Sequence, residues 1–185
     1  MTFLSAFDDL YERNIIKISK NKEDSIFYCS NEKESVLIDA HIFKTAERYV
    51  YIFSSVNCPE LEKVFNDAKC IAIIRNFLDV VERKLCIIID NCSDVSMIQT
   101  NIKDLILKYS SQVSVYLSFA HFTYKDKSAH FVVSDDKTFK LVTDNGRDLS
   151  FGNFNSQSNA RCLKEAFEKI KNSKSTYTYY TKGET

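Results

Sequence analysis

The residues of this chain best suited to chemistry are a histidine inside a short apolar segment and two asparagines that follow a glycine. His130 lies within residues 129–134, whose aromatic and β-branched residues predict a strand. Gly152, Asn153 and Asn155 come later and open a final amphipathic helix. An imidazole can act as a nucleophile or move a proton, and asparagine amides donate hydrogen bonds to anions. These residue types are suited to nucleophilic or proton-transfer chemistry and to hydrogen bonding.

The arrangement resembles one half-site of the phospholipase D superfamily, in which a strand His and a small polar turn face one phosphate. The resemblance covers residues 35–170, and its motif content lies in residues 129–144 and 152–155. In that family the His attacks phosphorus, a Lys two residues later neutralises phosphate oxygens, and an Asp follows after five more residues. The second His of a paired half-site protonates the leaving oxygen. The resemblance implies His130 as the nucleophile equivalent, and as the phosphate-binding turn it implies Gly152, Asn153 and Asn155.

The chain departs from this motif at the positively charged position. Val132 stands in the Lys position and Lys137 in the Asp position. An apolar side chain cannot neutralise an oxyanion, and losing one such group costs catalysis on the order of a hundredfold or more. The sequence therefore favours a degenerate half-site over an enzyme. We expect it to bind a phosphate-bearing ligand or nucleic acid, or to act as an assembly subunit.

Lys140 is the candidate to replace the missing lysine, and the register of a predicted hairpin decides whether it can. If residues 135–137 form the loop, we expect Ser134 to pair with Lys140. His130 then pairs with Asp144, and both Lys140 and Asp144 share the face of His130. A two-residue loop turns Lys140 away. The favourable register leaves open an active, metal-independent phosphodiesterase or nuclease, in which a homodimer brings two copies of His130 together.

Residues 173–185 form a polar tail that combines lysines with tyrosines. This composition is compatible with contact to a nucleic-acid backbone and with base stacking. The candidate nucleic-acid or partner contacts are Lys174, Tyr177 and Tyr179. The alternation of Thr and Tyr is equally typical of a strand that docks on a partner, and a terminus of this kind can also be disordered.

A pure protein-interaction module, within a homodimer or a hetero-oligomer, is the third interpretation. Compact phospholipase D-like proteins occur in bacterial antiphage defence and DNA processing, so the resemblance associates the chain with such systems. That association rests on the fold and not on any residue of a site.

Composition indicates an ordinary intracellular domain. The chain has 185 residues, of which 44% are apolar, and its 25 basic residues balance 25 acidic ones, so no strong overall field attracts nucleic acid or lipid. Its six cysteines show neither Cys-x-x-Cys pairs nor zinc-like spacing, which predicts reduced thiols and no metal or cofactor. The first ten residues lack the features of a signal peptide, and no apolar run is long enough to span a membrane. We expect a cytoplasmic protein.

Helical and strand patterns alternate along the chain, which predicts an α/β fold. The sheet should be mixed and mostly parallel at its centre, flanked by helices on both faces, with a C-terminal hairpin and helix. We expect residues 1–34 to be an N-terminal helix and irregular segment, and residues 35–172 to be the phospholipase D-like domain. The expected strands are residues 25–29, 49–54, 84–90, 113–119, 129–134 and 138–143. The expected helices are residues 4–13, 31–48, 59–81, 94–109 and 156–170. His41 is expected to be a structural residue, and His121 a surface residue.

Overall fold

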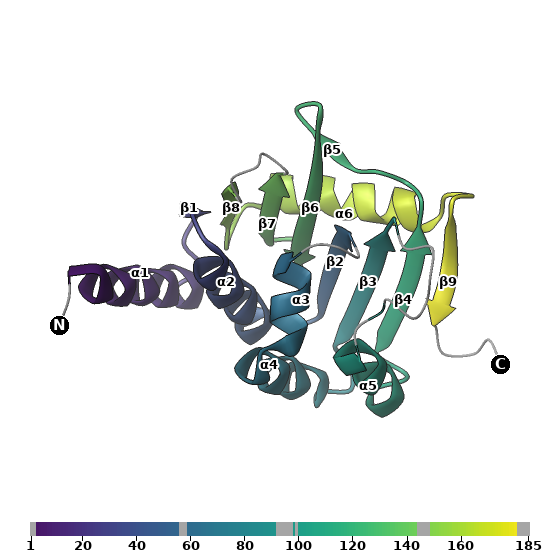
Figure 1. The fold of residues 1–185 in the computed structure, drawn as a ribbon, viewed down its shortest axis with the longest axis horizontal. Coiled ribbons are helices and arrows are strands. Elements are labelled where there is room, and N and C mark those ends of the chain that lie inside the picture. The colour runs from purple at the N-terminus through teal and green to yellow at the C-terminus, as the bar shows by residue number, and fades with distance from the viewer. Residues whose placement is uncertain (1–2, 56–58, 92–97, 99, 144–148, 181–185) are drawn as a thin grey trace.

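The computed structural model describes residues 3–55, 59–91, 98, 100–143 and 149–180. It has three layers, with a central sheet covered on one face by helices α2 to α5 and on the other face by α6 (Figure 1). The helices are α1 (Phe3–Lys20), α2 (Glu32–Thr45), α3 (Pro59–Asn66), α4 (Ala68–Leu78), α5 (Thr100–Lys108) and α6 (Gln157–Lys171). This is the α/β architecture expected from the sequence.

Within the described residues the strands form one mixed sheet in the order β1-β8-β7-β6-β2-β3-β4-β9, and β5 pairs with β6. Strands β2, β3 and β4 are parallel to one another, and antiparallel strands flank them on both sides. The strands are β1 (Ile26–Cys29), β2 (Tyr49–Ser55), β3 (Lys84–Asp90), β4 (Val113–Ser118), β5 (Thr123–Tyr124), β6 (Lys127–Ser134), β7 (Thr138–Thr143), β8 (Leu149–Asn153) and β9 (Thr176–Tyr180). The parallel part is thus the centre of the sheet.

Strand β3 is almost entirely apolar because both of its faces are covered. Ile87 and Ile89 pack into the core beneath α4 and α5, while Cys86 and Ile88 pack against the α6 side. Strand side chains alternate between faces, so a strand buried on both sides has no place for a polar residue until it ends. Its two polar residues stand at its ends, Lys84 at the start and Asp90 at the carboxyl end.

Two segments expected outside the central domain belong to the same sheet. Strand β1 pairs with β8 at one edge, and β9, in the region expected to be a polar tail, pairs antiparallel with β4 at the other edge. The tail therefore forms a strand, but this strand pairs with the chain's own sheet and not with a partner. At the β1 edge the hydroxyl of Tyr11 in α1 donates to the carbonyl of Tyr28, so a helix side chain satisfies part of the edge backbone.

The hairpin of β6 and β7 has the expected three-residue loop but a different register. Ser134 pairs with Thr138, and Val132 pairs with Lys140. The expected pairing of Ser134 with Lys140 is wrong by two positions, because the residues that directly flank a three-residue loop pair with each other. A shift of two leaves side-chain direction unchanged, so Lys140 still lies on the face of His130. His130 pairs with Val142, and Asp144 lies outside the described residues.

Three of the four cysteines that the structure describes are buried. Cys29, Cys70 and Cys86 are buried and Cys162 is exposed, and none of these four forms a disulfide, whereas Cys58 and Cys92 lie outside the described residues. Burial raises the pKa of Cys70 and of Cys86 to about 12, which keeps both thiols protonated at neutral pH. None of the helices described is long and apolar enough to cross a membrane.

His41 is a buried structural residue whose titration should make stability depend on pH. Its Nδ1 lies 3.0 Å from the Ser19 hydroxyl, and burial, assisted by Lys44, lowers its pKa from 6.5 to about 4. Between these values the unfolded chain binds a proton that the folded chain does not, so stability falls as the pH drops. We expect a loss of about 2 kcal/mol between pH 7.5 and pH 5 from this residue. Urea unfolding of wild type and His41→Gln at both pH values measures it, and an equal pH dependence in both proteins contradicts it.

Candidate functional site

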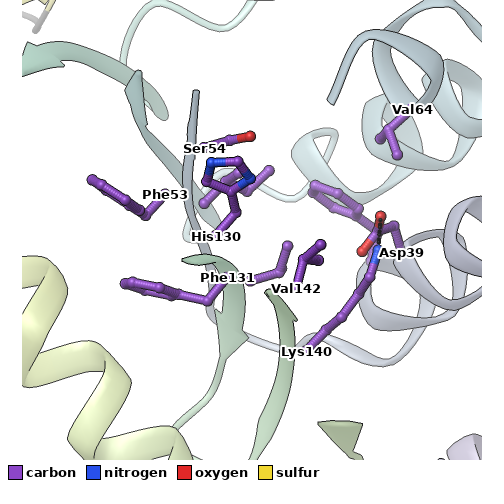
Figure 2. A pocket seen from close by; sticks show the side chains of 11 residues that line it. Asp39, Phe53, Ser54, Val64, His130, Phe131, Lys140 and Val142 are labelled. Atoms are coloured by element: carbon purple, nitrogen blue, oxygen red, sulfur yellow. Dashed lines mark hydrogen bonds and ion pairs between the residues drawn. The ribbon is translucent and has the colours of Figure 1, made fainter. Parts of the chain in front are cut away.

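His130 lies at the edge of the sheet where ligands usually bind to α/β proteins. Strand β6 runs antiparallel to β2, and the pairing of Phe131 with Phe53 puts His130 beside Ser54, near the carboxyl end of β2. Figure 2 shows the imidazole next to Ser54, while Phe53 and Phe131 point to the opposite face of the sheet. The carboxyl ends of parallel strands are the common ligand-binding edge of open α/β sheets. The fold therefore places His130 where a site is expected.

A cavity of about 30 Å³ lies next to His130, between the sheet and helices α2 and α3. This volume holds roughly one water molecule. Its polar and charged lining consists of Asp39, Ser54, His130 and Lys140, and the other lining side chains are apolar. As it stands, the cavity is too small for a nucleotide or a phosphodiester.

Lys140 shares this cavity with His130, but its charge is directed at α2. The Nζ atom lies 2.7 Å from Oδ2 of Asp39 and 3.3 Å from the carbonyl oxygen of Ser35, and it also donates to the Ser35 hydroxyl. Its side chain is 1% exposed (Figure 2). Because Lys140 stands directly opposite Val132, the fold supplies a cation one strand away from the motif position. That cation is neutralised inside the protein by Asp39.

The Gly152–Asn155 segment, expected to be a phosphate-binding turn, begins in strand β8 and is not brought to His130. Asn153 pairs with Phe139 of β7, and β7 separates β8 from β6. The Asn153 amide nitrogen donates to Asp24 at 2.8 Å, and its oxygen accepts from the Asn155 backbone at 2.7 Å. Both ends of this amide therefore serve local structure. A role of these asparagines in phosphate binding stays a prediction without geometric support.

Gly152 is required for packing. A Cβ atom at this position would lie 2.1 Å from the carbonyl oxygen of Phe139 and 2.5 Å from the ring of Phe27. The strand β1 side chain therefore lies directly over the Gly152 backbone. This close approach explains why position 152 is a glycine.

The three residues predicted to contact nucleic acid or a partner, Lys174, Tyr177 and Tyr179, differ in their exposure to solvent. Tyr177 is 44% exposed, and its ring lies 6.3 Å from the ring of Phe119, which is 53% exposed. Tyr179 is half-buried against the core on the α5 side of the sheet. Lys174 is exposed in the link from α6 to β9. Of these three candidates, Tyr177 and Lys174 are available to an external partner.

Asp135 has a structural role that the sequence interpretation missed. Its carboxylate accepts hydrogen bonds from the backbone N–H groups of Glu47 at 2.5 Å, Arg48 at 2.9 Å and Tyr49 at 3.1 Å. These bonds tie the hairpin loop to the start of β2.

The phospholipase D motif can also be aligned two positions earlier in the chain. Its Asp, seven residues after its His, then falls on Asp135. Ser128 then takes the His position and His130 the Lys position. In either alignment two of the three motif positions hold other residues.

The sequence interpretation also missed a contact between a histidine and an aspartate at the carboxyl end of β3. Nδ1 of His121 lies 2.9 Å from Oδ2 of Asp90. The available sequence signal was Asp90 at the end of an apolar run. Its partner, His121, is 31 residues away in the sequence. Among the residues that the structure describes, no three His, Cys, Asp or Glu side chains are grouped so as to hold a metal ion.

Comparison with known proteins identifies the fold but no sequence family. No protein-family model and no curated protein sequence matches the chain. The archaeal chromatin protein TrmBL2, whose structure shows a novel mode of DNA binding, matches 90% of this chain with a TM-score of 0.55 and 10% identity. The phosphatidylserine synthase of Haemophilus influenzae Rd KW20 matches 83% of this chain with a TM-score of 0.52 and 15% identity. The chain shares its fold with both proteins.

The α/β fold with a mixed sheet was expected from the sequence, and the resemblance to the phospholipase D superfamily stays a prediction. The chain spans 61% of the TrmBL2 chain and 39% of the synthase chain, so it corresponds to a part of each. Identities of 10% and 15% establish a shared fold and leave the activity to the residues of the site.

Proposed function

We propose that this chain is a phospholipase D-like domain that binds single-stranded nucleic acid without hydrolysing it. The observation that carries the proposal is the exposed aromatic pair of Phe119 and Tyr177, with Lys174 exposed three residues before Tyr177. Aromatic rings that stack on bases, next to lysines that contact phosphates, are the common elements of single-strand binding.

The surroundings of His130, which is half-buried, support the absence of hydrolysis. Phosphoryl transfer needs a positive group that is available to the phosphate oxygens as charge develops. Lys140 is held by Asp39 and Ser35, and the cavity beside it has room for roughly one water molecule. The geometry thus favours a domain that has kept the fold and lost the catalytic charge.

The aromatic pair is held rigidly enough to act as a stacking surface. Phe119 follows the end of β4, and its backbone N–H donates to the carbonyl of Ser175 at 3.0 Å, which joins it to the start of β9. Tyr177 pairs with Leu117 of β4, so both rings are fixed by the same two strands. The DNA-binding neighbour TrmBL2 shares this fold and lends the nucleic-acid interpretation further support.

Binding of a fluorescein-labelled oligothymidylate, followed by fluorescence anisotropy at low salt, tests the proposal. We expect the Phe119→Ala/Tyr177→Ala double variant to bind roughly five- to a hundredfold more weakly, because base stacking contributes about 1–3 kcal/mol per base. Lys174→Gln should weaken binding and reduce its salt dependence, since one phosphate contact is lost.

Tyr28→Ala is the matched control, because Tyr28 is an exposed tyrosine on β1 at the opposite edge of the sheet. It should bind like the wild type. Absence of binding by the wild type, or an equal loss in Tyr28→Ala, contradicts the proposal. Cleavage of the oligonucleotide in EDTA that disappears in His130→Ala would instead support the active phosphodiesterase.

A further inference from the structure

The contact between Asp90 and His121 joins a buried carboxylate to an exposed imidazole. Oδ2 of Asp90 lies 2.9 Å from Nδ1 of His121, and the two side chains are 6% and 66% exposed. Because a carboxylate only accepts hydrogen bonds, we place the proton of this contact on Nδ1. The second ring nitrogen, Nε2, therefore keeps its lone pair when the ring is neutral, on a side chain that solvent reaches.

The carboxylate of Asp90 has few donors around it other than this ring. Within the described part of the chain, Oδ1 of Asp90 is buried and accepts no hydrogen bond. Ser118, which is opposite Asp90 on strand β4, uses its hydroxyl elsewhere: it contacts the Thr176 hydroxyl at 2.7 Å and accepts the Ala120 backbone N–H at 3.0 Å. A buried carboxylate in this state interacts strongly with any positive charge that develops on the ring it holds.

The backbone on both sides of His121 is also held in place. Ala120 is bonded to Ser118, and the carbonyl of Phe122 accepts the backbone N–H of Ala129 at 3.0 Å. Both the ring and the backbone of His121 are thus positioned before any reaction. A group that is already positioned loses little conformational freedom when it reacts, which favours its use as a nucleophile.

We propose that His121 is a phosphoryl-acceptor histidine, modified on Nε2 by a donor of the phosphoramidate class, and that Asp90 is its positioning residue. The lone pair of Nε2 forms a bond to phosphorus, and the electrons of the donor's P–N bond leave with its nitrogen, which departs as ammonia. The ring gains positive charge as the new N–P bond forms, and Asp90 stabilises that charge through Nδ1–H. This inference does not depend on nucleic-acid binding.

The other two histidines of the chain serve as internal controls. His41 is buried, and its Nδ1 lies 3.0 Å from the Ser19 hydroxyl. His130 is half-buried and lines the cavity of about 30 Å³, which has room for roughly one water molecule. A phosphoryl donor should therefore reach His121 more easily than either of them.

Incubation of the full chain with potassium phosphoramidate near pH 8, followed by mass spectrometry of the intact protein and of its fragments, measures the modification at each histidine. We expect one phosphoryl group on His121, before His130 or His41 reacts, and its loss in mild acid as a P–N bond requires. His121→Gln should abolish this modification. N-acetylhistidine in the same tube is the reference for an unassisted imidazole and should react more slowly than His121.

Asp90→Asn tests the positioning role. It keeps the imidazole, but it should lower the rate at His121 by about tenfold or more and shift the neutral tautomer toward Nε2–H, which ¹⁵N NMR of the ring detects. Asp104→Asn is the matched control, because Asp104 is an exposed aspartate on α5, and it should react like the wild type.

Two results would overturn the proposal. One is a reaction of His130 or N-acetylhistidine that is as fast as that of His121, and the other is a wild-type rate in Asp90→Asn. If Asp90→Asn does not fold, the comparison of His121 with the other histidines and with N-acetylhistidine in the wild-type protein decides the question.

Discussion

Replacing Lys140 with methionine should lower the free energy of unfolding by about 3–5 kcal/mol, because it leaves a buried carboxylate without its cation. Asp39 and Lys140 have side chains that are 6% and 1% exposed, so solvent cannot compensate for the loss. The Ser35 hydroxyl and carbonyl would lose their donor as well. Urea unfolding at neutral pH measures the change.

Two further variants separate the missing charge from a general effect of mutation. Lys137→Met removes an exposed lysine from the same hairpin and should change stability by less than about 0.5 kcal/mol. The Lys140→Met/Asp39→Leu double variant removes both buried charges and should recover most of the loss. If Lys140→Met is as stable as the wild type and loses affinity for phosphate or oligonucleotide instead, Lys140 serves a ligand and our interpretation of the pair is wrong.

Gly152→Ala should be at least as disruptive as many core truncations, with an expected loss of about 3 kcal/mol or more. The added methyl group would lie 2.1 Å from a backbone oxygen, which cannot move without displacing strand β7. It would also meet the ring of Phe27, which packs against Phe154 with 5.0 Å between centroids. Thermal and urea unfolding both report this loss.

Ser150→Ala is the matched control on the same strand. Ser150 is buried two residues before Gly152, and its hydroxyl has no hydrogen-bond partner among the residues that the structure describes. Its replacement by alanine should be nearly neutral, because no hydrogen bond is broken. A Gly152→Ala protein of wild-type stability that had lost only phosphate binding would restore the anion-binding interpretation of this segment.

Local patterns in the sequence predicted many of the elements closely. Residues 84–90 and 138–143 are strands with the expected bounds, because an apolar run and a β-rich segment next to a tight loop depend little on distant contacts. The expected helix start near residue 31 is also found, and the Asn31 side chain caps it by accepting the backbone N–H of Glu34 at 2.9 Å. These features depend on neighbours within a few residues.

Strand β8 could not be predicted by the same reasoning. Gly152 and Asn153 are typical of turns, yet they pair with β1 on one side and β7 on the other. The glycine is tolerated in a strand because Phe27, far away in sequence, occupies the space of its missing side chain. Only the assembled sheet contains that information.

The same distinction between local sequence and tertiary structure applies to the candidate site. Strand alternation in the sequence limited Lys140 to one of two orientations, and the three-residue loop seen in the structure puts it on the face of His130. The tertiary structure decided what these residues can do, since Asp39, 101 residues from Lys140, neutralises the lysine. It also brought His121 to Asp90 at the end of a central strand. The charge balance and solvent access of a side chain depend on its neighbours in the folded protein. These neighbours are distant in the sequence and come together only when the sheet and helices pack.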